Sequence, residues 1–222
     1  MARLSALPSA TPSAIVAAAA ELFRKHGYAG TSIQQVSAAA GLSKGNLTYH
    51  FPSKRELFEA VQQEALRYVE ERVMERSFAE GPDTLSSLEE FARRLRRLFV
   101  DDTDTFVGCL FTNVAMETRH ADRAVADMAR QSMVVLRERV ARHLARGQEL
   151  GEVRGDLPPE VLARMFFWLY EGALTMARAL EDSSEYDLFR SSLRQWFAPA
   201  AARTDGNGTS LPQTMPLGGH QS

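Results

Sequence analysis

The chain of 222 residues contains a single cysteine, Cys109. One thiol excludes an internal disulfide, and a chain without disulfides is typical of a reducing cytosol. The longest apolar runs, at 14–20 and 165–170, are much shorter than the roughly 20 residues that a helix needs to span a bilayer. Two prolines, Pro8 and Pro12, interrupt the N-terminal region, which does not fit a signal peptide. We therefore expect a cytoplasmic protein that does not bind membranes.

The sequence also lacks the alternation of apolar and polar residues that marks β-strands, and it shows no internal repeats. Apolar residues recur instead at spacings of three and four, the period of an amphipathic helix. We predict an all-α fold that opens with three short helices. The helices expected after them lie at about 53–76, 85–98, 106–120, 121–149, 158–180 and 185–197. The small and polar residues of 1–10 and 201–222 are expected to be disordered.

Acidic residues are absent from one stretch, residues 22–55, although the whole chain has a net charge of −2. This stretch holds five lysines and arginines, so it carries +5 and the rest of the chain carries −7. A small basic module on an acidic body is typical of a DNA-binding protein.

Within this stretch, residues 41–55 have the pattern of a turn followed by a short helix. Gly41 permits a tight turn, and Ser43 can cap the helix that follows. Leu47 and Phe51 are four residues apart and would bury one face of that helix. The basic, amide and aromatic side chains left outward suit the major groove of DNA, whose base edges offer hydrogen-bond donors and acceptors.

The candidate DNA contacts fall into two groups. The residues expected to meet base edges are Lys44, Asn46 and Tyr49. The residues expected to bind phosphates are Thr31, His50 and Lys54, two of them near helix N-termini that favour anions. For Tyr49 the alternative is a half-buried position in the core.

Residues 15–60 resemble a known family. The residues that carry the resemblance are Ala19, Leu22, Phe23, Gly27, Tyr28, Thr31, Ile33, Val36, Ala39, Gly41, Ser43, Gly45, Leu47, Tyr49, Phe51, Ser53, Lys54 and Leu57. Together they are similar to the N-terminal DNA-binding domain of TetR-family transcriptional repressors. Family members often have a tyrosine directly after the aliphatic residue of the recognition helix, where this chain has Thr48. At that DNA-binding position a phenol that presses on the phosphate backbone is replaced by a shorter hydroxyl.

The resemblance implies a helix-turn-helix DNA-binding domain at 11–58 and a helical ligand-binding and dimerisation domain at 59–200. It also implies a homodimer that binds a palindromic operator in double-stranded DNA and is released by a small-molecule or electrophile inducer. Two alternatives stay open: a helical-bundle enzyme that carries a helix-turn-helix, and a transcriptional activator. The sequence shows no catalytic set of residues, and we predict no cofactor.

The helix expected at 158–180 is apolar nearly all round, more than one buried face requires. We expect one side to pack on its own body and the other on a second copy of the chain. The candidate interface residues are Trp168, Leu169, Gly172 and Ala173. Pairing through the last two helices is also what the family resemblance implies. The alternative is a central helix buried inside a monomer.

The stripe at 106–120 is the candidate effector site. The expected ligand-binding residues are Phe106, Cys109, Asn113, Met116, Glu117 and His120, facing Phe166 and Tyr170. An apolar pocket with a few polar groups is the usual form of a small-molecule site. For each residue alone, an ordinary core or surface position is the alternative. Glu117 and His120 have the spacing of a di-iron motif, but a second such pair is absent, so we predict no metal.

Cys109 follows Gly108 near the expected start of this helix, where free amides and the helix dipole favour a thiolate. The Gly-Cys-Leu sequence also resembles that of some TetR-like sensors of electrophiles and oxidants. A reactive thiol is therefore one hypothesis, and a buried, inert cysteine is the other.

Overall fold

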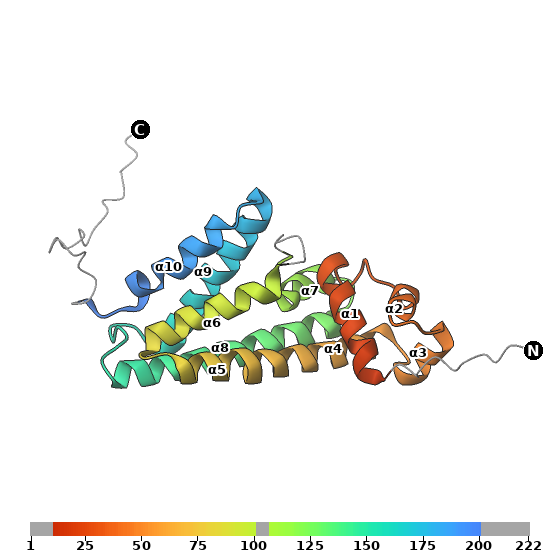
Figure 1. Cartoon of the computed structure of the whole chain (residues 1–222), viewed down its shortest axis with the longest axis horizontal. Coiled ribbons are helices and arrows are strands. Elements are labelled where there is room, and N and C mark those ends of the chain that lie inside the picture. The colour runs from red at the N-terminus through yellow and green to blue at the C-terminus, as the bar shows by residue number, and fades with distance from the viewer. Residues whose placement is uncertain (1–10, 101–106, 201–222) are drawn as a thin grey trace, which may run out of the picture.

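The computed structural model describes residues 11–100 and 107–200, which form helices and the turns that join them. The elements in chain order are α1 (Pro12–His26), α2 (Ile33–Ala39), α3 (Lys44–His50), α4 (Lys54–Tyr68), η1 (Val69–Met74), α5 (Glu75–Glu80), α6 (Thr84–Phe99), α7 (Leu110–Thr118), α8 (Arg123–Glu149), α9 (Pro159–Leu180) and α10 (Ser184–Phe197). The predicted all-α class is confirmed. Helices α1 to α3 form a head at one end of an elongated molecule, and the remaining helices form its body (Figure 1).

Local capping signals explain the boundaries of the head helices. Ser32 and Gln35 form a reciprocal capping box at the start of α2. The side chains of Ser43 and Ser53 accept hydrogen bonds from backbone amides at the starts of α3 and α4. Gly41, which joins α2 to α3, has a φ of +69°, a conformation that favours glycine. The predicted helix, turn and helix therefore follow from short-range interactions.

The helix that starts at Lys54 extends to Glu80 as α4, η1 and α5, a little beyond its expected end. It begins in the head and runs beside α8 in the body (Figure 1). The amide of Gln62 donates a buried hydrogen bond of 2.7 Å to the hydroxyl of Ser132 on α8. The middle turn, η1, has π-helical hydrogen bonds, a local widening that is frequent at functional sites. This continuous helix is one mechanical connection between head and body.

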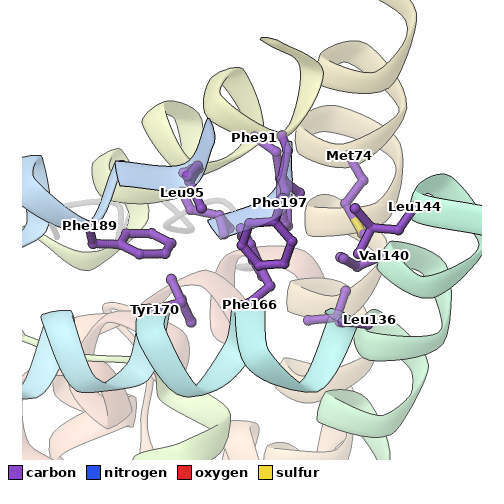
Figure 2. Close-up of a cluster of buried hydrophobic side chains, with 14 of the residues drawn as sticks. Met74, Phe91, Leu95, Leu136, Val140, Leu144, Phe166, Tyr170, Phe189 and Phe197 are labelled. Carbon is purple, nitrogen blue, oxygen red and sulfur yellow. The ribbon is translucent and has the colours of Figure 1, made fainter. Parts of the chain in front are cut away.

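The core of the body is rich in aromatic side chains. Phe166 of α9 is fully buried and stacks on Phe91 of α6 and Tyr170 of its own helix. Figure 2 shows these rings beside Phe197 of α10 and aliphatic side chains of α8. The hydroxyl of Tyr186 donates to the backbone carbonyl of Ala92 at 2.8 Å, so this buried phenol is satisfied. The last two helices are thereby fixed to α6.

The core of the head is not separate from the body. Phe23 and Tyr28 pack with Phe58 of α4 in one apolar cluster. The same cluster includes Val114 of α7 and Val125 of α8, which belong to the body. Because the two parts share buried side chains, a shift of α7 or α8 changes the packing of the head.

Candidate DNA-binding surface and effector pocket

The outer face of α3 is exposed and carries the side chains predicted to reach bases. Lys44 and Asn46 are exposed, and Tyr49 is 83% exposed, so it is not a core aromatic. Leu47 is fully buried and anchors the helix to the head. His50 is half-buried, and its ring makes an edge contact with that of Tyr49 at 5.3 Å between centroids. The arrangement leaves a basic and polar surface free for another molecule.

Three other predicted DNA contacts have partners within the chain. Thr31 is only 2% exposed, and its hydroxyl donates to the carbonyls of Leu22 and Gly27 at 3.2 and 2.8 Å. This correction has a simple reason: a buried hydroxyl that satisfies two carbonyls is not available to a phosphate. The hydroxyl of Thr48 donates to carbonyls in its own helix. The ammonium group of Lys54 lies 4.3 Å above the ring of Tyr28, a cation–π contact that fixes its position.

A largely apolar cavity of about 880 Å³ lies between the head and the body. Its walls come from α1, α4, α6, α8 and α9 and from residues 108–111 at the start of α7. Of the predicted ligand-binding residues, Cys109 and Tyr170 line it. Phe166 lies behind Tyr170 in the core, and Phe106 lies outside the described residues. A molecule in this cavity would contact α1 of the head as well as the body.

The C-terminal half of α7 turns away from the cavity, contrary to the sequence-based expectation. Met116, Glu117 and His120 are exposed, and His120 accepts a hydrogen bond from Arg119. Asn113 donates to the carbonyl of Val107 instead of facing the cavity. The reason is that side chains point in different directions along a helix. The first turn of α7 faces the cavity, whereas its last turn faces the head.

The carboxylate of Glu117 has another role, which the sequence did not reveal. It accepts hydrogen bonds from the backbone amides of Tyr28 and Ala29 at 2.8 and 2.9 Å, across the boundary between body and head. We call these two bonds the Glu117 latch. Gly27, next to them, has a φ of +76°, and a Cβ there would lie 2.9 Å from the carboxylate oxygens.

Two more polar contacts join α1 of the head, or the start of α4 beside the head, to distant parts of the chain. Arg24 of α1 donates to the carbonyl of Val100 at 3.0 Å. Arg55 at the start of α4 pairs with Asp122, the N-cap of α8, at 3.2 Å. Both contacts join residues at least 67 positions apart in the sequence, so no local pattern could indicate them.

A polar group forms part of the cavity wall. The hydroxyl of Thr112 donates to the carboxylate of Glu171 at 2.8 Å, and the thiol of Cys109 also hydrogen-bonds this carboxylate. Burial, reinforced by the nearby charge of Glu171, raises the pKa of Cys109 to about 12. Of the two hypotheses for Cys109, the structure therefore favours the buried, inert cysteine, because desolvation outweighs the effect of the helix N-terminus. Burial also raises the pKa of Glu171 and that of the Tyr170 phenol.

Taken together, the geometry defines a class of protein. A helix-turn-helix with an exposed outer face shares its core with a helical body, and a large apolar cavity lies between the two. None of the helices in residues 11–100 and 107–200 is both long and apolar enough to cross a membrane. Over the same residues, histidine, cysteine, aspartate and glutamate side chains do not gather in threes as a metal ion would require. This architecture is that of a DNA-binding regulator with an effector site.

Comparison with known proteins identifies the family. The sequence model described as "Bacterial regulatory proteins, tetR family" matches residues 15–61, and that described as "Tetracyclin repressor-like, C-terminal domain" matches residues 85–193. The chain belongs to the TetR family, so it is a transcriptional regulator and not an enzyme.

Similar proteins span nearly the whole length. The HTH-type transcriptional repressor DhaR of Mycobacterium sp. (strain GP1) is 27% identical over 191 residues, 81% of this chain and 88% of that protein. The HTH-type transcriptional repressor AcnR of Corynebacterium efficiens is 29% identical over 195 residues, 82% of this chain and 91% of that protein. A TetR-family transcriptional regulator from Agrobacterium tumefaciens has a solved structure with a TM-score of 0.76 at 20% identity. That alignment covers 84% of this chain and 97% of the other, and at this identity it shows the fold alone.

Proposed function

We propose that the protein is a cytoplasmic, ligand-responsive transcriptional repressor that binds a palindromic operator as a homodimer. The observation that carries the proposal is the shared packing of the DNA-binding head and the body around one cavity. An effector in that cavity touches both parts, so it can favour an arrangement in which the two heads of a dimer no longer match the operator half-sites. The names of DhaR and AcnR support repression.

For DNA recognition we propose that Lys44, Asn46 and Tyr49 contact bases and that His50 and Lys54 contact phosphates. The exposure of the first three supports their role. The hydroxyl of Thr48 donates to a carbonyl inside α3. Thr48 can therefore offer DNA its methyl group, or its hydroxyl if that internal hydrogen bond breaks.

For the homodimer we propose the outer faces of α9 and α10. Large apolar side chains are exposed there, and we call the set Val161, Trp168, Met176, Leu180, Leu188 and Trp196 the α9–α10 face. Trp168 is 67% exposed and Leu188 is 65% exposed, unusual values for residues of this size in a monomer. Gly172 is exposed with open space beside it, whereas Leu169 and Ala173 are half-buried against their own body. The two helices lie side by side, away from the head (Figure 1).

The DNA assignment can be tested with sequences selected from a random DNA pool. Fluorescence anisotropy then measures affinity for the selected duplex at several salt concentrations. The logarithm of the affinity should fall with that of salt by roughly 0.9 per phosphate neutralised. Lys44→Ala should lower affinity about tenfold and relax preference at one base pair, while Lys54→Ala should weaken all sequences about equally.

The matched control is Arg142→Ala, which removes one exposed positive charge from α8 in the body. It should leave the affinity for DNA within about twofold of the original. If Lys44→Ala and Tyr49→Ala bind the selected duplex as well as the unchanged protein does, α3 is not the recognition helix.

A further inference from the structure

We propose that the effector is a hydrophobic organic cation, such as a quaternary ammonium or phosphonium ion with aromatic groups, whose charge lies beside the Glu171 carboxylate. The inference rests on the proposed function, since it names the chemical class that the effector cavity accepts. Three features of the cavity support it: apolar aromatic walls, a half-buried carboxylate without a cationic partner in the part of the chain that the structure describes, and neutralised charges elsewhere on the lining.

The walls near Glu171 suit a large apolar molecule. The aromatic side chains that line the cavity are Phe51, Tyr68, Phe91, Phe99, Phe111, Phe167 and Tyr170. Burial of apolar ligand surface against such rings favours binding. The faces of aromatic rings also attract cations at distances up to about 6 Å. Neither property distinguishes a cation from a neutral ligand strongly. The preference for a cation therefore depends on the Glu171 carboxylate.

Glu171 is half-buried at the cavity wall, and its hydrogen-bond partners are the neutral groups of Thr112 and Cys109. Among the described residues, no lysine, arginine or histidine forms an ion pair with it. A carboxylate removed from water without an opposite charge is costly. A cation in the cavity would replace the missing solvation, whereas an anion would be repelled.

The other acidic groups on the lining are already neutralised. Glu21 pairs with Arg24 and Lys25, each at 2.9 Å. Glu64 pairs with Arg67 at 2.7 Å. These pairs lie on α1 and α4, so they provide no unpaired charge for a ligand. The charge selectivity of the cavity therefore depends on Glu171.

The proposal predicts a pH dependence with a definite sign. Burial raises the pKa of Glu171, while the hydrogen bonds from Thr112 and Cys109 lower it. The facing groups that titrate are the Cys109 thiol and the phenols of Tyr170 and Tyr186, whose pKa values are all raised by burial, so these groups stay neutral near pH 7. Affinity for a cation should thus fall as the pH is lowered through the raised pKa of Glu171, because protonation removes the attracting charge.

The experiment uses the full chain and two probes of nearly identical shape and opposite charge, tetraphenylphosphonium and tetraphenylborate. Isothermal titration calorimetry measures the affinity of each. We expect phosphonium to bind the unchanged protein, and Glu171→Gln, which keeps an acceptor for Thr112, to lower that affinity tenfold or more. The control Glu59→Gln, which neutralises an exposed carboxylate of α4 outside the cavity lining, should change it less than twofold. Equal phosphonium affinity in Glu171→Gln and the unchanged protein, or tighter binding of the borate, would overturn the proposal.

Two further measurements keep the outcome decisive. If Glu171→Gln does not fold, the affinity of the unchanged protein for phosphonium is measured from pH 8 down to pH 4, below the ordinary pKa of a glutamate, and a constant value overturns the proposal. Anisotropy of the selected duplex shows whether phosphonium releases the DNA. If phosphonium binds the protein but does not release the duplex, the effector assignment is overturned and the proposed DNA-binding function is not. A protein that binds no duplex in the absence of ligand contradicts the proposed function instead.

Discussion

The substitution Glu117→Ala should uncouple the head from the body. The Glu117 latch holds the amides of Tyr28 and Ala29 at the end of α1. The same helix, α7, begins at Leu110, a residue of the cavity wall. A displacement of α7 by an effector is therefore transmitted directly to the head. Removal of the carboxylate breaks both hydrogen bonds and leaves the packing of α7 unchanged, because Glu117 is exposed.

The magnitude follows from the type of bond. A hydrogen bond to a charged group contributes about 1.5–3 kcal/mol when it is buried. Exposure reduces this value, so we take about 0.5–1 kcal/mol for each bond and about 1–2 kcal/mol for the latch. The corresponding factor is about 5- to 30-fold. We expect the Tyr28 and Ala29 amides to exchange hydrogen faster by this factor and the effector to release DNA less completely by up to the same factor.

Hydrogen exchange detected by NMR or mass spectrometry measures the first effect without knowledge of operator or effector. The control is Met116→Ala, which truncates the adjacent exposed side chain of α7. Gly27→Ala should reproduce part of the effect, since its Cβ would displace the carboxylate and the residue has a positive φ. Unchanged exchange at Tyr28 and Ala29 in Glu117→Ala would refute the reasoning, because the two bonds would then not protect these amides in solution.

Three other predictions concern the dimer, the thiol and acid stability. Trp168→Glu should convert the proposed homodimer to a monomer or an aggregate, as light scattering can show, since an obligate interface of about 2,000 Å² does not tolerate a central charge. An unchanged protein that is monomeric at micromolar concentration would contradict pairing through the α9–α10 face. Cys109, with a pKa of about 12, should resist N-ethylmaleimide at pH 7 until the protein is denatured, as mass spectrometry can show; rapid native labelling would restore the hypothesis of a sensor thiol. Burial lowers the pKa of His143, which stacks on Phe78, so its contribution to stability is complete above the unfolded pKa of about 6.5 and is lost as the pH falls through the folded pKa. His143→Phe should therefore show a smaller loss of melting temperature between pH 7.5 and pH 5 than the unchanged protein, and an equal loss would exclude His143 as the cause.

The sequence by itself determined the helical elements and which side chains α3 leaves exposed. Caps such as Ser32, Ser43 and Ser53 act within three residues, and the apolar periodicity acts within a few turns, so both are readable along the chain. The predicted helix at 158–180 corresponds closely to α9 at Pro159–Leu180 for the same reason. The exposure of Lys44 and Tyr49 follows from the burial of Leu47 on the opposite face.

Only the tertiary structure decided what each helical face meets. Glu117 was expected in the ligand pocket because it shares a helix with Cys109, yet its partners lie 88 and 89 residues away in the head. Thr31 was expected to bind phosphate, but the fold of its loop buries its hydroxyl against backbone carbonyls. No sequence pattern indicates Glu171, because its separation from positive charge depends on side chains from several helices. Caps and periodicity are interactions within one helix, whereas pockets, latches and unpaired charges arise between helices, and their geometry is fixed only when the helices pack.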